Sequence, residues 1–171
     1  MKITDFLKQQ DVYLFKSVKD YKEIFEKTLP SSIPLKNNRS IRKREIIYHI
    51  LEREKISPTF IGFEIAMPHA KIKGLEEPVL RLAIVKDGVD YPSAKNRCKI
   101  IFLFLTPEDT PETHLQIMSR ISGLLEKEAF RINLLNSLLS KQVYDVLFSE
   151  EGIGKSGFAN IGEKDIFIEL A

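Results

Sequence analysis

The sequence predicts an α/β fold in which helices cover both faces of a central sheet. The strongest evidence is Lys99–Leu105, a near-continuous apolar run with the length of a strand. A strand that is apolar on both sides must be covered on both faces. A second strand is predicted at Val79–Val85, where the pattern approaches alternation, and several other segments carry apolar residues at helical spacing. These segments supply the two covering layers.

The composition is that of one globular domain. Of 171 residues, 43% are hydrophobic and 29% are charged, which excludes a disordered or fibrous chain. A formal net charge of +2 is too small to favour nucleic acid or a membrane surface as partner. Cys98 is the single cysteine, so no internal disulfide forms, and the chain opens without the apolar run of a signal peptide. We therefore expect a cytoplasmic protein without membrane insertion.

Three elements are expected before the central strands. A short strand is predicted at Asp11–Phe15, and Ser17 is a candidate cap for a helix that ends before Pro30. A second helix is predicted from Ser40 to Lys55. The buried face of the first helix is expected to hold Val18, Tyr21, Phe25 and Leu29, and that of the second Ile46, Ile47, Ile50 and Leu51.

After Val85 the residues Lys86–Val89 are expected to turn the chain. The strand at 99–105 is followed by Thr110 as a candidate N-cap and Pro111 as the first helical residue. The core stripe of that helix is predicted to be Leu115, Met118, Ile121, Ser122 and Leu125, with two more helices around Phe130–Leu138 and Val143–Leu147.

The chain is predicted to divide near residue 150. Residues 1–150 form the folded domain, and residues 151–171 form a C-terminal tail whose four glycines are typical of a flexible linker. The segment Asp165–Leu170 in this tail can pair as an edge strand or dock on a neighbour.

Arg53 continues the apolar stripe of the second helix, three residues after Ile50, while Glu52 and Glu54 are expected to turn aside. An arginine directed inward at a helix end requires an anionic partner, either a carboxylate or an arriving ligand. The alternative is an arginine that lies over the core with its guanidinium in water.

His69 is the candidate nucleophile. Pro68 restricts the backbone before it, and the small Ala70 leaves room for a partner to approach. An accessible, unprotonated imidazole in this position is suited to covalent catalysis. The alternative is an ordinary surface turn at a strand end.

His114 and Thr59 are further candidates. His114 lies in the first turn of a helix, where the positive end of the dipole disfavours protonation, so it is expected to be a neutral hydrogen-bond donor. The alternative is a helix-edge histidine bonded to the sheet. Thr59 either binds an anionic group or caps its own backbone.

Other chemistries fit less well. A histidine-pair nuclease requires more positive charge. A zinc site requires a third ligand, and His49 and Cys98 have no ligand spacing to the other histidines. There is no glycine-rich nucleotide loop, so a phosphoryl donor is expected to be a protein, without a cofactor.

Five stretches together resemble the enzyme IIA domain of the mannitol/fructose class in the bacterial sugar phosphotransferase system, which includes the nitrogen-regulatory enzyme IIA proteins. The resemblance covers the chain from the first predicted helix to about Glu150. Glu64 stands where the class often has glycine, next to the bulky Phe63, and Ala70 replaces the commoner glycine. The five stretches are Glu52-Arg53-Glu54, Ser57–Gly62, Ile65–His69, Thr106-Pro107 and Thr113-His114-Leu115.

The resemblance implies a three-layer sandwich with a mixed, mostly parallel sheet of about five strands. It implies a phosphotransferase in which His69 accepts a phosphoryl group from the phosphocarrier HPr or a paralogue, with His114 as auxiliary hydrogen-bond donor, Arg53 as phosphate clamp and Thr59 as a further hydroxyl. The regulatory branch is favoured by Thr106–Thr110 and Thr113–Leu115. The alternatives are a sugar-transport enzyme IIA that passes the group to an enzyme IIB, and a relative used only for its fold.

Overall fold

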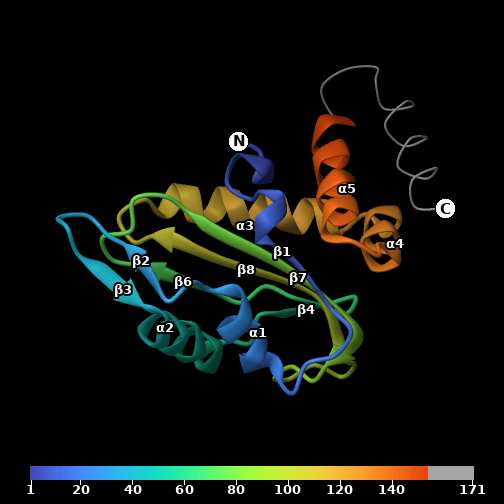
Figure 1. Cartoon of the computed structure of the whole chain (residues 1–171), viewed down its shortest axis with the longest axis horizontal. Helices are drawn as coiled ribbons and strands as arrows, with labels where there is room; N and C mark the ends of the chain where they lie inside the picture. Colours follow the sequence, from blue (N-terminus) through green and yellow to red (C-terminus); the bar gives the residue numbers. More distant parts are fainter. Residues whose placement is uncertain (154–171) are drawn as a thin grey trace.

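A computed structural model describes residues 1–153 and shows a three-layer α/β sandwich (Figure 1). Its main sheet has six strands in the order β1-β7-β8-β5-β4, with β6 paired to β8 beyond the end of β5. Three of the five pairings are parallel and two are antiparallel. The strands are β1 (Val12–Phe15), β4 (Phe60–Gly62), β5 (Ile65–Ala66), β6 (His69–Ile72), β7 (Val79–Val89) and β8 (Cys98–Pro107).

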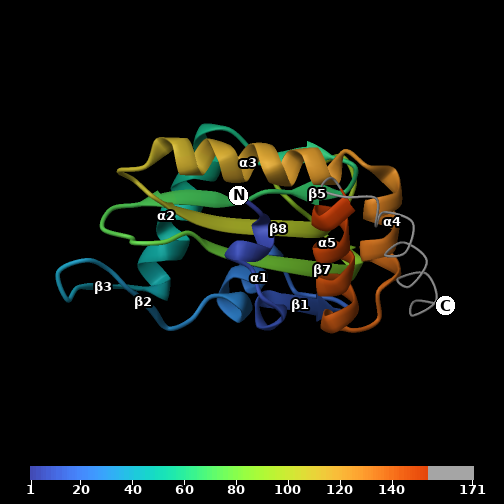
Figure 2. The same ribbon diagram turned by 90° about the horizontal axis from the view of Figure 1, so that it is seen from above.

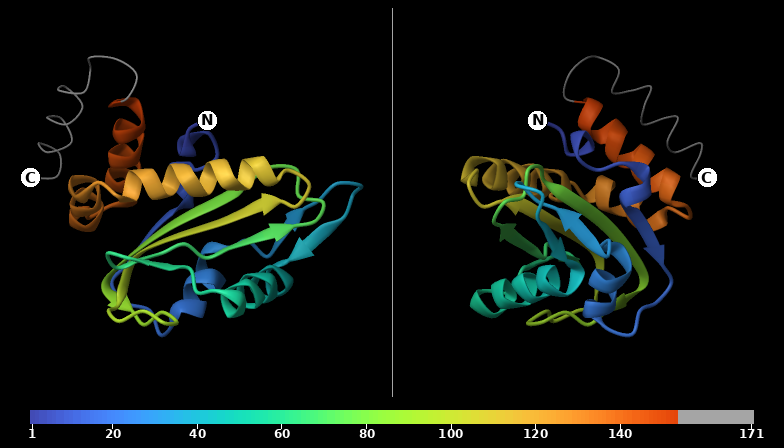
Figure 3. Two further views of the ribbon diagram at one scale, coloured as in Figure 1. Left: turned by 180° about the vertical axis from the view of Figure 1, so that it is seen from behind. Right: turned by 60° about the vertical axis from the view of Figure 1, so that its left-hand side comes forward.

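Helices cover both faces of the sheet, as predicted. Figure 3 shows α1 (Tyr21–Thr28) and α2 (Lys43–Ile56) on one face and α3 (Pro111–Leu125) on the other. Figure 2 shows α4 (Glu128–Asn136) and α5 (Ser140–Ile153) together at one end of α3. Two short 3₁₀ turns, η1 (Ile3–Asp5) and η2 (Gln9–Asp11), precede β1.

The central strand β8 is buried on both sides, which confirms the prediction from its apolar run. Ile100, Phe102 and Phe104 pack in the cluster that includes residues of α3, α4 and α5. Leu103 and Leu105 face the opposite cluster, which contains residues of α1 and α2. The alternation of side chains along a strand therefore divides one apolar run between two cores.

Two predicted boundaries were wrong on the N-terminal side. The side chain of Asp20, rather than Ser17, caps α1 by accepting a 3.0 Å hydrogen bond from the Glu23 amide. The second helix was predicted to begin at Ser40, but α2 begins at Lys43, and the antiparallel hairpin of β2 (Ser32–Pro34) and β3 (Ser40–Arg42) precedes it. Its strands are only three residues long, so they carry too short a pattern to be recognised by alternation.

The predicted turn at Lys86–Val89 is also wrong, because β7 continues through it to Val89. The pairing of β7 with β8 shifts register between Ile84 and Val89. Gly88 lies in this irregular part with φ of +75°, and a Cβ there would approach the Cβ of Arg97 to 2.8 Å. Glycine and its neighbours thus form a bulge within a strand rather than a hairpin turn.

No helix among residues 1–153 is long and apolar enough to cross a membrane.

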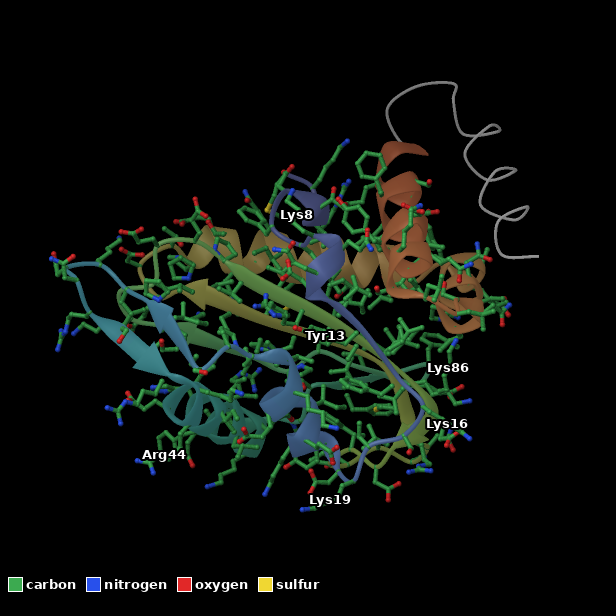
Figure 4. The ribbon with its side chains drawn as sticks, in the orientation of Figure 1. Lys8, Tyr13, Lys16, Lys19, Arg44 and Lys86 are labelled. Carbon is green, nitrogen blue, oxygen red and sulfur yellow. The ribbon has the colours of Figure 1, made fainter. Side chains whose placement is uncertain are left out.

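The charged side chains labelled in Figure 4, which include Lys8, Lys19, Arg44 and Lys86, project from different sides of the molecule. This distribution agrees with the small net charge of +2 and does not form a basic face from these residues.

The end of α5 is tied to the start of the chain. Glu151, which the sequence analysis assigned to the tail, belongs to α5 and is 2% exposed. Its carboxylate accepts hydrogen bonds from the backbone amides of Ile3 at 2.6 Å and Thr4 at 2.8 Å, and Arg120 pairs with it at 3.3 Å. The rest of the predicted tail, with its candidate edge strand, lies outside the described residues.

We expect this contact to define how far the chain can be shortened. Deleting residues 154–171 should leave the urea midpoint of unfolding nearly unchanged, because Glu151 remains in place. Deleting residues 151–171 should lower the free energy of unfolding by about 2 to 4 kcal/mol, because two buried amides lose a charged acceptor. Urea unfolding of both truncations and of Glu151→Gln in the full chain measures this. Equal midpoints for the two truncations would contradict it.

Candidate functional site

A hollow of about 480 Å³ opens beside β6, between α2 and α3. Among the described strands β6 pairs only with β8, and three of its residues, His69, Ala70 and Lys71, line this hollow. Figure 1 shows β6 between the two helices. We call this space the histidine hollow; it is lined by His49, Glu52, Arg53, Ile56, His69, Ala70, Lys71, His114, Leu115 and Met118.

The backbone before β6 aligns His69 with the central strand. The carbonyl of Pro68 accepts a 3.1 Å hydrogen bond from the Phe104 amide, and His69 lies opposite Phe104 in the parallel ladder. Upstream, Gly62, Phe63 and Glu64 all have positive φ angles, of 92°, 52° and 63°. Two non-glycine residues in this conformation make the turn between β4 and β5 strained, by roughly 1 kcal/mol each. Glycine at position 64, which the resembling class often has, would remove part of this strain.

The ring of His69 is held from two sides and is 5% exposed. Its Nδ1–H donates to the carbonyl of Met67 at 2.8 Å, and the ring stacks on Phe104 with centroids 4.9 Å apart. Because a carbonyl only accepts, Nδ1 carries the proton and Nε2 carries a lone pair. Burial lowers the pKa of His69, opposed by the Met67 hydrogen bond, and the charge of Arg53 lowers it further. An unprotonated Nε2 is the state that a nucleophile requires.

His114 lies next to His69, with ring centroids 5.1 Å apart, and is 4% exposed. Its Nδ1 is 2.6 Å from the hydroxyl of Thr106 at the end of β8. Burial lowers the pKa of His114 to about 4, with smaller contributions from His69, Lys71 and Arg53. The ring is therefore neutral near pH 7, as predicted, although burial rather than the helix dipole is the main cause.

The predicted core stripe of α3 was partly confirmed: Ile121 and Leu125 are buried, whereas Leu115, Met118 and Ser122 are not. Leu115 is 64% exposed and, with Met118, lines the histidine hollow. An apolar pattern does not distinguish residues that pack in the core from apolar residues that line a site. The residues of α3 that are buried are His114, Ile117, Ile121, Leu124 and Leu125.

Arg53 lines the hollow from the last turn of α2. Its Nη1 donates to the carbonyl of Ser57 at 2.9 Å, and the structure pairs it with no carboxylate within residues 1–153. The guanidinium is thus oriented by a neutral acceptor, and it keeps further N–H groups for an anion. Lys71, which the sequence analysis missed, lines the same hollow two residues after His69. The sequence did not predict the strand β6, and only its extended backbone, in which side chains alternate, places both side chains on one face.

Glu54 turns inward rather than aside, which corrects the sequence-based prediction. It is 7% exposed, and its carboxylate accepts hydrogen bonds from the Thr59 amide at 3.0 Å, the Tyr91 hydroxyl at 2.5 Å and the Thr59 hydroxyl. Thr59 is accordingly directed at Glu54 and does not line the histidine hollow. Position 54 is four residues after Ile50, so it shares the buried face of α2. This network ties the end of α2 to the loop that leads to β4.

No group of three or more His, Cys, Asp and Glu side chains within residues 1–153 is arranged to hold a metal ion. The described part of the chain instead places His69 and His114 in one hollow with Arg53 and Lys71, whose two positive charges exceed the single carboxylate of Glu52 in the lining. Such a set favours an anionic group that arrives at a histidine.

The chain matches a known protein family over most of its length. Residues 5–150 match the family described as phosphoenolpyruvate-dependent sugar phosphotransferase system, EIIA 2. The chain belongs to this family. Membership carries the general role of a phosphotransfer carrier, a kind of transferase.

Relatives of both branches are found. The fructose-specific EIIABC component of Bacillus subtilis is 32% identical over 150 residues, which cover 86% of this chain and 23% of that protein. A nitrogen regulatory protein of Bradyrhizobium diazoefficiens is 26% identical over 148 residues, covering 86% of this chain and 95% of that one. The crystal structure of nitrogen regulatory protein IIA-Ntr from Neisseria meningitidis matches with a TM-score of 0.74 at 22% identity. The match covers 85% of this chain and 98% of that one. This chain therefore spans about a quarter of the fructose-specific relative and nearly all of the other two.

The low pKa values make the stability of this EIIA domain dependent on pH. At a pH between about 4 and 6.5 the unfolded chain protonates its histidines while the folded protein keeps His114 neutral. The unfolded state then binds more protons, so the free energy of unfolding falls as the pH decreases through this window. Each such histidine contributes up to about 1.4 kcal/mol per pH unit.

Urea unfolding at about pH 7 and about pH 5 measures this dependence. His114→Gln should lose less stability between the two conditions than the wild type, because glutamine does not titrate. Carboxylates respond equally in both proteins, so the difference isolates the histidine. The same loss of stability in both proteins would contradict a low pKa at His114.

Proposed function

We propose that this EIIA domain accepts a phosphoryl group on Nε2 of His69 from an HPr-like phosphocarrier protein. The observation that carries the proposal is the tautomer of His69, in which the Met67 carbonyl holds the proton on Nδ1 and leaves the lone pair on Nε2. The position of His69 in the lining of the histidine hollow also supports the proposal, since a donor protein would approach the ring from there.

The transfer balances without any further reactant. A bond forms between the phosphorus and Nε2 of His69, and the P–N bond of the donor's phosphohistidine breaks with its electron pair returning to the donor ring. Nδ1 of His69 keeps its proton and its hydrogen bond to Met67 throughout. Arg53 and Lys71 neutralise the charge of the phosphoryl oxygens, and His114 contributes a hydrogen bond. Thr59 acts on this site only through Glu54.

We favour a regulatory enzyme IIA of the nitrogen-related branch, whose phosphorylation state decides which proteins it contacts in the cytoplasm. The nitrogen regulatory relative supports this, since the match extends over 95% of its length. The alternative is a sugar-transport enzyme IIA that passes the group to an enzyme IIB, which the fructose-specific EIIABC relative supports. Transfer to enzyme IIB proteins from the same organism distinguishes the two.

The proposal is tested by incubation with phosphoenolpyruvate, enzyme I and HPr or its paralogue from the same organism. The intact mass should rise by one phosphoryl group, and acid treatment should remove it, as is characteristic of a phosphohistidine. Omission of the HPr-like protein should prevent the increase. An unchanged mass with every HPr paralogue of the organism would overturn the proposed function.

A further inference from the structure

Thr106 and His114 form a buried pair that the sequence analysis did not connect. Thr106 is fully buried at the end of β8, and His114 is 4% exposed in the first turn of α3. Their contact, 2.6 Å between the threonine Oγ1 and Nδ1 of the histidine, is short for a hydrogen bond. It joins the central strand to the helix that forms one wall of the histidine hollow.

The direction of this hydrogen bond follows from the partners of each group. A threonine hydroxyl has one proton to donate, and the part of the chain that the structure describes offers Thr106 no acceptor except Nδ1 of His114. If Nδ1–H donated instead, the buried hydroxyl proton would have no partner, at a cost of about 1 to 3 kcal/mol. The hydroxyl therefore donates to Nδ1, and the single proton of the neutral ring lies on Nε2.

We propose that Thr106 is a positioning residue that holds His114 as the Nε2–H tautomer, with this N–H available to a phosphoryl oxygen on His69. The inference rests on the proposed function of His69. The two rings then have complementary roles at one hollow. The hydrogen bond to a backbone carbonyl leaves Nε2 of His69 unprotonated. The hydrogen bond from a hydroxyl leaves the proton of His114 on its Nε2.

This arrangement explains why a neutral histidine is useful beside the acceptor. A cationic ring next to His69 would attract phosphate in the resting state, whereas a neutral donor adds its hydrogen bond only when the phosphoryl oxygens arrive. The hydroxyl also fixes the rotation of the ring, so the donor is in place before transfer.

The test compares Thr106→Val, Thr106→Ser and a control, Thr28→Val, in the full chain. Valine has nearly the shape of threonine and favours a strand, so Thr106→Val removes the hydroxyl with little change in volume. Thr28 is also buried, and its hydroxyl donates to the carbonyl of Ile24 at 2.7 Å within α1, on the face of the sheet opposite α3. The control therefore makes the same chemical change at a residue that does not line the hollow.

The first readout is the His114 ring itself, observed by proton–nitrogen NMR without any phosphoryl donor. The wild type should show the Nε2–H tautomer. A hydroxyl that donates to Nδ1 stabilises only the neutral ring, so Thr106→Val should raise the pKa of His114 by roughly half to one unit, and Thr106→Ser should not. A hydroxyl that accepts from Nδ1–H would produce the opposite sign. An Nδ1–H tautomer, or a lower pKa in Thr106→Val, would overturn the proposal.

The second readout is the rate of transfer from the phosphorylated HPr-like protein. Thr106→Val should reduce the rate at saturating donor by about 3- to 30-fold, because the ring adopts the donating orientation less often. The donor concentration for half-maximal rate should not change, since Thr106 is buried away from any docking surface. Thr106→Ser and Thr28→Val should transfer at nearly the wild-type rate. Wild-type rates for folded Thr106→Val would overturn the positioning role.

The two proposals fail in different ways. If the wild type has the Nε2–H tautomer but accepts no phosphoryl group, the proposed function is overturned and the assignment of the hydrogen bond stands. If the wild type is phosphorylated and Thr106→Val is phosphorylated equally fast, the function stands and the role of Thr106 is overturned.

Discussion

His69→Gln is expected to abolish phosphorylation, with no increase in intact mass under conditions that label the wild type completely. An amide nitrogen has no available lone pair, so it does not act as the nucleophile that Nε2 of His69 provides. The neighbouring His114 does not replace the lost acceptor, because its Nδ1 is already engaged by Thr106. We therefore expect a complete loss rather than a slower reaction.

His114→Ala is the matched control for this result. It removes the neighbouring imidazole from the same hollow and leaves Nε2 of His69 intact. Labelling should reach completion but proceed about 10- to 1000-fold more slowly, which is the range for loss of one oriented donor. Circular dichroism and the urea midpoint verify that both variants are folded. Two results would reverse the assignment of acceptor and donor. One is full labelling of His69→Gln, and the other is a complete absence of labelling in His114→Ala while His69→Gln is labelled.

Arg53→Ala is expected to slow phosphorylation by roughly 30- to 1000-fold while the urea midpoint changes little. The loss of one charge-assisted contact to the phosphoryl group in a partly shielded site is worth about 2 to 4 kcal/mol. Stability should be nearly unaffected because the guanidinium bonds only to the Ser57 carbonyl among the described residues, and that carbonyl is exposed. Arg53→Lys should lie between the wild type and alanine, since a point charge lacks the planar fork.

Arg44→Ala provides the control for a change in charge alone. Arg44 is exposed on the same helix and projects from the outer side of α2 in Figure 4. Its removal should leave the transfer rate within about a factor of two at moderate salt, because exposed charges more than a Debye length apart are screened. Transfer rate and urea midpoint are measured on all four proteins. A lower midpoint with an unaltered rate for Arg53→Ala would remove Arg53 from the site.

The histidines and the arginine stood out in the sequence as candidates because their signals are local, and the family resemblance supplied the roles expected of them. Pro68 and Ala70 mark His69, Thr110 and Pro111 mark the start of the helix that carries His114, and the spacing from Ile50 places Arg53 at a helix end. The supporting groups gave no such signal. Glu54 and Tyr91 are 37 residues apart, and only the packed fold brings their carboxylate and hydroxyl to 2.5 Å.

The sequence by itself determined the α/β class, the strand that is buried on both faces and the order of the five α-helices. These follow from the spacing of apolar residues, because buried side chains recur with the period of a helix or a strand. The tertiary structure decided how the elements are rotated and joined. It turned α3 so that His114 lies inward and Leu115 outward, extended β7 through the bulge at Gly88, and set Thr106 against His114. Periodicity reports which residues are apolar, whereas hydrogen-bond partners and the lining of the histidine hollow depend on which surfaces meet when all layers pack together.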